Sequence, residues 1–334
     1  LTEEILIGVR CTDKIYRLLV VTAACVVLAS GCKGPEKVVV AYEEENYNKD
    51  IYRGSFFAEN LCTATTDIIP EGGGGVDTST LNSAALFDVN GRTVDFACRI
   101  HERLYPASTT KIMTALVAIK NADLSATVTV SPYADVSNFA SDEKTCGIKG
   151  GDRLTLLDLL HGLLLESGND AAVAIAVHVG GSTDAFSQMM NDEAKRLMAT
   201  NTNFVNSNGL HDENHYTTAY DLYLIFNECI KHEEFVNIIN TKQYTVQITG
   251  NDGSVRQENW AQTNFYATGK AESPTAATVI GGKTGTTDQA GNCLILLNKT
   301  LDESPYISIV MGANTKELLY QDMTALINGI PANE

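Results

Sequence analysis

Ser108 and Lys111 stand at the start of a segment that the sequence predicts to be a buried helix. Pro106 precedes them, and residues 112–119 are almost all apolar, as expected of a helix surrounded by the protein core. Side chains three positions apart share one face of a helix, so the amine of Lys111 can accept the hydroxyl proton of Ser108. A serine at a helix start also offers a backbone N–H without an intrahelical partner, which can stabilise a developing oxyanion. The segment therefore predicts a nucleophile, its base and half of an oxyanion hole.

The Ser-x-x-Lys pattern is not specific by itself, because it occurs three times in this chain. The match at residues 30–33 ends a hydrophobic leader, and the match at residues 141–144 lies in a polar segment without a helix pattern. Only Ser108 precedes a predicted helix, so the context selects it.

A second candidate is Ser167-Gly168-Asn169, at a break between two predicted helices. The motif brings a hydroxyl and an amide together at this break. The alternative is a helix cap, because Ser, Gly and Asn are all favoured at helix ends.

The third candidate is Lys283-Thr284-Gly285-Thr286, which places a cation and two hydroxyls along one predicted strand. Gly285 lacks a side chain, so a ligand backbone can approach the strand closely there. The alternative is a strand that simply ends in a turn.

The composition is that of a globular protein, with 44% hydrophobic and 19% charged residues. The 334 residues suffice for two modest domains or for one core with a large insertion. The formal charge of −17 argues against nucleic acid, or an anionic membrane surface, as a partner bound through charge.

The N-terminal segment has the layout of a signal peptide over residues 1–31, with basic residues followed by an apolar run. The run is shorter than the roughly 20 residues that a membrane-spanning helix needs. Residues 28–32 resemble a bacterial lipobox, which makes Cys32 the predicted lipid attachment site; an ordinary signal peptide and a stop at the membrane are the alternatives. Polar residues 32–80, which include four consecutive glycines, are predicted to form a tether.

The remaining pattern predicts an α+β catalytic domain over residues 81–330. Asn90-Gly91 separates two extended runs and predicts a hairpin. A mainly helical lobe is expected at about residues 121–245, inserted between strands from both ends of the chain that form one antiparallel sheet flanked by helices. Its predicted helices are residues 153–165, 170–179, 184–198 and 218–240, and the later elements are strands at 276–280, 293–297 and 306–310 with a final helix at 316–328.

Taken together, the three motifs resemble those of the active-site-serine penicillin-binding proteins and β-lactamases. The sequences around them, at residues 105–115, 166–171, 208–221 and 283–294, are similar to the low-molecular-mass D-alanyl-D-alanine carboxypeptidases. The resemblance runs from about Asn82 to Ile327 and implies a β-lactamase/transpeptidase-like fold. Many members carry a further β-rich domain and a membrane anchor after the catalytic domain, and neither is expected in this chain.

The resemblance implies a serine-type carboxypeptidase that removes the terminal D-alanine from peptidoglycan stem pentapeptides. Ser108 would be the nucleophile, Lys111 its base and Ser167 the proton relay to the leaving nitrogen. Substrate would be held by a set of binding residues: Asn169, Lys283, Thr284, Gly285 and Thr286. β-Lactams would acylate Ser108 as substrate mimics, and no cofactor or metal is expected.

Two other functions share these motifs: β-lactamase and a penicillin-binding sensor without turnover. The class A β-lactamases use a Glu downstream of the second motif to activate water. Glu166 directly precedes Ser167, and Glu233 lies in a predicted helix far downstream, so neither fits that role. His211 and His215 fall in a predicted loop and are not expected to bind a metal, and Cys293 is expected to be a buried core thiol.

Overall fold

The computed structural model describes residues 60–331 of the chain. The predicted signal peptide, Cys32 and the part of the predicted tether before residue 60 lie outside the described residues. The strands are β1 (Ser83–Asp88), β2 (Thr93–Cys98), β3 (Thr127–Thr129), β4 (Arg153–Thr155), β5 (Gln243–Thr249), β6 (Val255–Ala261), β7 (Thr278–Thr287), β8 (Gly291–Lys299) and β9 (Pro305–Ala313). The α-helices are α3 (Lys111–Asn121), α4 (Leu156–His161), α5 (Asn169–Gly180), α6 (Thr183–Arg196), α7 (Ala219–Cys229), α8 (Glu233–Asn240), α9 (Phe265–Thr268) and α10 (Lys316–Asn328). Short helical turns are η2 (Glu71–Gly75), η3 (Ala107–Thr110), η4 (Pro132–Ala134), η5 (Val136–Asn138) and the π-turn η6 (Gly162–Glu166).

The larger sheet joins both ends of the described chain, as the sequence predicted. Its strand order is β2-β1-β9-β8-β7, and all four neighbouring pairs are antiparallel. The predicted hairpin is confirmed, since β1 and β2 pair on either side of Asn90-Gly91 with Ala84 opposite Cys98. The mixed helix and antiparallel-sheet fold is therefore confirmed.

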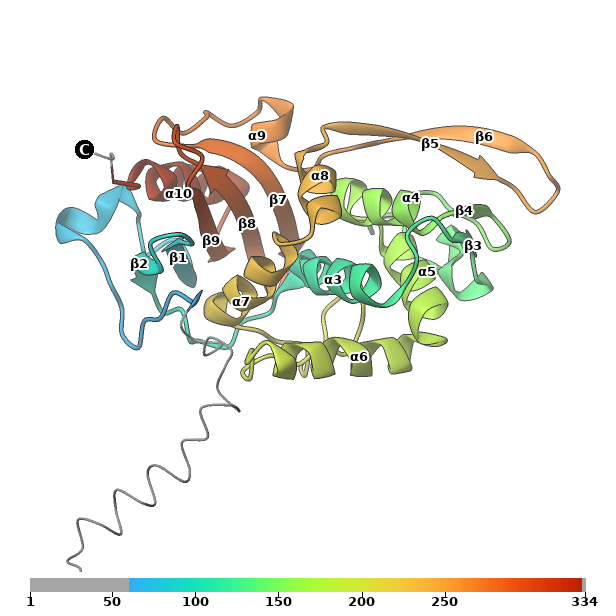
Figure 1. The fold of residues 1–334 in the computed structure, drawn as a ribbon, viewed down its shortest axis with the longest axis horizontal. Coiled ribbons are helices and arrows are strands. Elements are labelled where there is room, and N and C mark those ends of the chain that lie inside the picture. Colours follow the sequence, from blue (N-terminus) through green and yellow to red (C-terminus); the bar gives the residue numbers. More distant parts are fainter. Residues whose placement is uncertain (1–59, 332–334) are drawn as a thin grey trace, which may run out of the picture. The chain divides into compact units, whose positions relative to one another are not determined.

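Each face of this sheet is covered by helices, which explains why residues 293–297 of the central strand β8 are all apolar. On β8, Leu294 and Leu296 pack in the cluster that includes α10, while Ile295 and Leu297 pack in the larger cluster with α3 and α7. Successive strand residues point to opposite faces, so a strand between two helical layers needs no polar face. Figure 1 shows α10 and the α3–α7 layer on either side of the strands. Helix α10 has the bounds that the sequence predicted.

The helical lobe differs from the prediction in three places. Residues 153–155 form strand β4 and not the first turn of a helix, and Thr155 then caps α4 through a capping box with Asp158. Residues 218–240 form two helices, because the chain turns between Cys229 and Glu233. Strands β5 and β6 form a long hairpin that joins β3 and β4 in a second sheet, which the sequence analysis did not predict.

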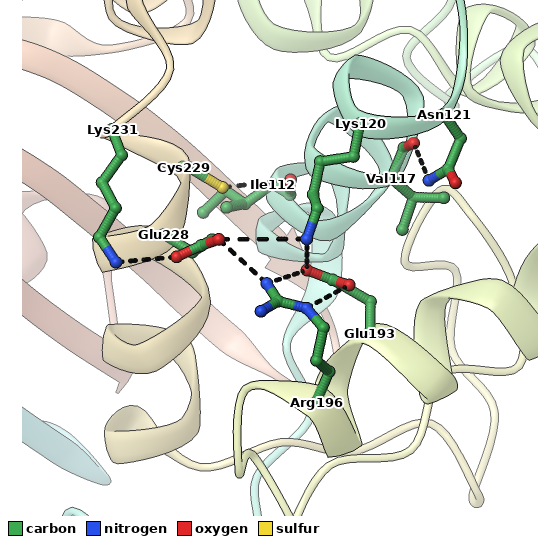
Figure 2. Close-up of polar contacts among 9 residues, drawn as sticks. All are labelled: Ile112, Val117, Lys120, Asn121, Glu193, Arg196, Glu228, Cys229 and Lys231. Carbon is green, nitrogen blue, oxygen red and sulfur yellow. Dashed lines mark hydrogen bonds and ion pairs between the residues drawn. The ribbon is translucent and has the colours of Figure 1, made fainter. Parts of the chain in front are cut away.

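A network of charges ties α3 to α6 and α7 (Figure 2). Arg196 of α6 donates two hydrogen bonds to Glu193, at 2.9 and 2.7 Å, and one to Glu228 of α7 at 2.9 Å. Lys120 near the end of α3 lies 2.7 Å from Glu193, and Lys231 lies 2.8 Å from Glu228. Several charges that share partners lose less side-chain entropy per bond than isolated pairs, so the network helps to hold α3 in place.

Residues 61–80 are packed against the domain, which corrects the prediction of a tether for this part of the chain. The N–H of Cys62 donates to the hydroxyl of Tyr223, at 2.9 Å, and Ile68 pairs with Ala97 of β2. Val76 is buried in the α10 cluster. The segment was predicted to be a tether because most of its residues are polar, and the few side chains that attach it to the domain give no pattern in the sequence. Over residues 60–331, no helix combines the length and the apolar character needed to cross a membrane.

Candidate active site

The nucleophile candidate Ser108 lies in the tight turn η3, and α3 begins only at Lys111. The sequence had placed Ser108 at the start of the α-helix itself, so the helix begins three residues later than predicted. Ala107 has a positive φ of 49°, and the hydroxyl of Thr109 donates to the carbonyl of Pro106 at 2.7 Å. These two features turn the chain sharply and leave Ser108 at the wall of a pocket.

Lys111 is fully buried and its amine has three oxygen neighbours. Nζ lies 3.1 Å from Oγ of Ser108, 2.8 Å from Oδ1 of Asn169 and 2.6 Å from the carbonyl oxygen of Asn208. The two oxygens of Asn169 and Asn208 can only accept. A neutral amine has two hydrogens, so donating both to these acceptors leaves its lone pair for the hydroxyl proton of Ser108. Asn208 is a site residue for which sequence reasoning predicted no role, because it contributes only its backbone.

The second motif is shaped by a break between the π-turn η6 and helix α5. Ser167 has a left-handed backbone with a φ of 65°, and its Oγ accepts a hydrogen bond from Nζ of Lys283 at 2.9 Å. Gly168 has no room for a side chain, since a Cβ there would lie 2.3 Å from the sulfur of Cys146. Asn169 then begins α5 with its amide turned to Lys111. The motif is thus a helix boundary whose side chains are used for the site and not as caps.

The third motif runs along β7, the edge strand that passes the Ser108 turn. Lys283 is buried, and its amine also donates to the carbonyl of Thr284 at 2.8 Å. A Cβ on Gly285 would lie 3.0 Å from the backbone nitrogen of Ser108, so only glycine lets the strand come so near. Thr286, one residue on, is exposed beside the same turn.

Burial shifts both lysines toward their neutral forms. It lowers the pKa of Lys111 to about 7, although the nearby Cys146, Asp170 and Glu143 act in the opposite direction. Burial, together with the charge of Lys111, holds the pKa of Lys283 well below its ordinary value. A buried amine that loses its proton near neutral pH is suited to general-base catalysis.

The predicted residues meet at one pocket. Ser108, Ser167, Thr284, Gly285 and Thr286 line it. Lys111 contacts Ser108, Lys283 contacts Ser167, and Asn169 contacts Lys111. The pocket also has wall residues that the sequence analysis did not select: Lys144, Thr263, Phe265, Cys293, Lys316, Leu319 and Tyr320. Most of these residues lie outside the three motifs and gave no signal in the sequence. Lys144 belongs to the Ser-x-x-Lys match at residues 141–144, which was set aside because it lacks a helix pattern. Cys293 is buried, and burial raises the pKa of its thiol to about 11, which keeps it in the unreactive thiol form.

The histidines near the site have structural surroundings. His215 is buried, where its Nε2 lies 2.8 Å from the hydroxyl of Thr110 and its Nδ1 accepts from the N–H of Val205. Burial lowers the pKa of His215 to about 4. His211 packs edge-on against Tyr105, with the ring centroids 4.7 Å apart. Within the described part of the chain, no three His, Cys, Asp or Glu side chains are grouped so that they could hold a metal ion.

Comparison with known proteins identifies the family. Residues 75–315 match the peptidase family described as D-alanyl-D-alanine carboxypeptidase. The chain belongs to this family. It is 31% identical over 249 residues to the D-alanyl-D-alanine carboxypeptidase DacF of Bacillus subtilis, covering 74% of this chain and 61% of that protein. It is 32% identical over 236 residues to DacC of Escherichia coli, covering 68% of this chain and 55% of that protein.

Solved structures show the same fold. The Streptomyces K15 DD-transpeptidase superposes with a TM-score of 0.68 at 28% identity, covering 80% of this chain and 98% of that one. A D-alanyl-D-alanine carboxypeptidase from Mycobacterium tuberculosis superposes with a TM-score of 0.67 at 26% identity, covering 79% of this chain and 95% of that one. The β-lactamase/transpeptidase-like fold is therefore confirmed, whereas the chain spans only about three fifths of the length of the first curated relatives.

Proposed function

We propose that this protein is a serine D,D-carboxypeptidase that removes the terminal D-alanine from peptidoglycan stem pentapeptides. The observation that carries the proposal is the environment of Lys111, a buried amine with two acceptor-only neighbours and the Ser108 hydroxyl at 3.1 Å. Family membership supports the substrate class, since the relatives are named for D-alanyl-D-alanine.

In the proposed reaction, neutral Lys111 accepts the proton of Ser108 while Oγ attacks the carbonyl between the two D-alanines. The backbone N–H groups of Ser108 and Thr286 would hold the resulting oxyanion. The proton that Lys111 accepted then passes to the leaving nitrogen through Ser167, whose Oγ accepts a hydrogen bond from the amine of Lys283. The C–N bond breaks, D-alanine leaves, and water hydrolyses the ester on Ser108.

The substrate would be held by the residues on either side of Ser108. Asn169 would bind the amide of the penultimate residue, and Lys283, Thr284 and Thr286 would lie along the terminal carboxylate. The amine of Lys283 already donates to Ser167 and to its own strand. The exposed Lys316 lines the same pocket and offers a cation for the carboxylate. Penicillins present a similar carbonyl and carboxylate, so they should acylate Ser108.

The two glutamates weighed for a β-lactamase do not serve this pocket. Glu166 contacts the N–H of Ala261 in β6, at 3.4 Å, and Glu233 lies in the first turn of α8. A transpeptidase differs only in the acceptor of the acyl group, and one matching structure bears that name. The assay therefore includes an amine acceptor beside water.

We also propose an extracytoplasmic location, with attachment to the outer face of the cytoplasmic membrane through a lipid on Cys32. The apolar leader and the lipobox-like residues 28–32 support it. Mass spectrometry of the mature N-terminus checks it, and a chain that retains residues before Cys32, or lacks the lipid, would contradict it.

The deciding experiment measures D-alanine release from an N-acylated Lys-D-Ala-D-Ala tripeptide, with and without an added amine acceptor. We expect release by the unmodified chain and none by Ser108→Ala. Penicillin labelling without release would identify a sensor, and rapid turnover of penicillin would identify a β-lactamase. Transfer to the amine in place of hydrolysis would identify a transpeptidase.

A further inference from the structure

Residues 143–148, a segment before β4, are fastened to the first turn of α5. The N–H of Asn169 donates to the carbonyl of Lys144 at 2.8 Å. The buried carboxylate of Asp170 accepts from the N–H of Cys146 at 2.8 Å and from that of Ile148 at 3.1 Å. These bonds join the segment to the second motif. The bond to the carbonyl of Lys144 holds the backbone next to Glu143 in place.

Glu143 reaches the side-chain amide of Asn169 from the side opposite Lys111. Nδ2 of Asn169 donates to Oε2 of Glu143 at 3.3 Å, while its Oδ1 accepts from Nζ of Lys111 at 2.8 Å. A flipped amide would set its oxygen against a carboxylate and its NH₂ against an amine. The contact between the amide oxygen and the carboxylate would then be repulsive, so Glu143 selects one orientation of the amide.

That orientation matters for the base. If the amide flipped, its NH₂ group could donate to the lone pair of Lys111 and compete with the proton of Ser108. With Oδ1 on Lys111, the lone pair is left for the nucleophile.

We infer that Glu143 is a positioning residue, which holds the Asn169 amide so that the lone pair of Lys111 faces Ser108. This inference rests on the proposed acylation of Ser108. Neither the three motifs nor their spacing assigns Glu143 a part in it.

The same carboxylate also acts on Lys111 through its charge. The ionisable groups that face this amine come from several elements: Glu143 and Cys146 of the 143–148 segment, Asp170 of α5, Lys283 of β7 and His215 of the loop before α7. Burial sets the low pKa of Lys111, and the negative charge of Glu143 opposes it by favouring the protonated amine. Removing the charge should lower the pKa of Lys111 further.

The test is the acylation rate with a fluorescent penicillin, measured across about pH 5 to pH 9. Glu143→Gln keeps an acceptor for Nδ2 and removes the charge. We expect its plateau rate to be within about twofold of that of the unmodified chain. The acid limb, which is the rise of the rate with pH below the plateau, should have its midpoint about half a pH unit lower. Glu143→Ala removes the acceptor too, and its plateau should fall by about fivefold or more. Asp142→Asn removes an exposed neighbouring charge and should leave both features unchanged.

The proposed function and the inference about Glu143 are each contradicted by a different result. An unmodified chain that is not acylated would defeat the proposed function itself. Normal acylation with the same acid limb in Glu143→Gln, and the same plateau in Glu143→Ala, would defeat the inference. So would equal changes in Asp142→Asn.

Discussion

The contact between β7 and the Ser108 turn makes Gly285 a position where one added methyl group should lower activity. A Cβ there would lie 3.0 Å from each of three backbone atoms, the oxygen of Pro106 and the nitrogens of Ser108 and Thr109. Carbon needs about 3.5 Å from such neighbours, so Gly285→Ala must part the strand and the turn by about half an ångström. Because Thr286 follows on the same strand, the two N–H groups of the proposed oxyanion hole would move apart.

The magnitude follows from what an oxyanion hole contributes. Losing one donor outright costs about a hundredfold to a thousandfold in rate, so a lengthened donor should cost about tenfold to a hundredfold. Overpacking at the same site should lower the free energy of unfolding by about 1–3 kcal/mol. We would measure penicillin acylation of Gly285→Ala under single-turnover conditions and its unfolding in denaturant.

The control is Gly329→Ala, which makes the same substitution after α10 at a negative φ of −76°. Its added Cβ would meet only the carbonyls of Leu326 and Ala325, at 3.2 and 3.8 Å. We expect acylation at the rate of the unmodified chain. If Gly285→Ala also acylates at that rate while remaining folded, the oxyanion hole is not built from Ser108 and Thr286 and the reasoning is refuted.

Three further predictions use other parts of the structure. Acylation should rise with pH through about 7 as Lys111 loses its proton, increasing about fivefold from pH 6 to pH 7 in stopped-flow experiments; a flat profile would contradict Lys111 as the base. Ser167→Ala should lower acylation by about a hundredfold or more because the proton relay is lost, and near-normal acylation would exclude that role. Arg196→Ala should lower the free energy of unfolding by about 1 kcal/mol, and by less at high salt, because it removes the ion pairs with Glu193 and Glu228. The control Lys195→Ala should change this free energy little, since the Lys195 side chain is 69% exposed. Equal effects of the two substitutions would show that the network between α3, α6 and α7 does not stabilise the fold.

The parts of the fold predicted well are those with strong local signals. The Asn90-Gly91 hairpin and helix α10 are encoded in turn chemistry and in apolar spacing, so they needed no knowledge of neighbours. The hairpin of β5 and β6 was missed because exposed polar residues alternate along it and few are buried. Val246, Ile248 and Trp260 of the hairpin pack in the large core cluster, a tertiary contribution that local propensity does not show.

The sequence by itself determined the chemistry of this protein, because a hydroxyl, two amines and an amide in three spaced motifs limit the reactions that they can perform together. Tertiary structure decided what those groups can do at neutral pH. Lys111 and Lys283 are ordinary lysines in the sequence, and only burial by separate elements moves their pKa values toward the neutral amine. Tertiary structure also decided that Glu143 and Asn208 belong to the site. Glu143 contacts Asn169, 26 positions away, and Asn208 contacts Lys111, 97 positions away. No local pattern records such contacts, since they arise only when the chain has packed.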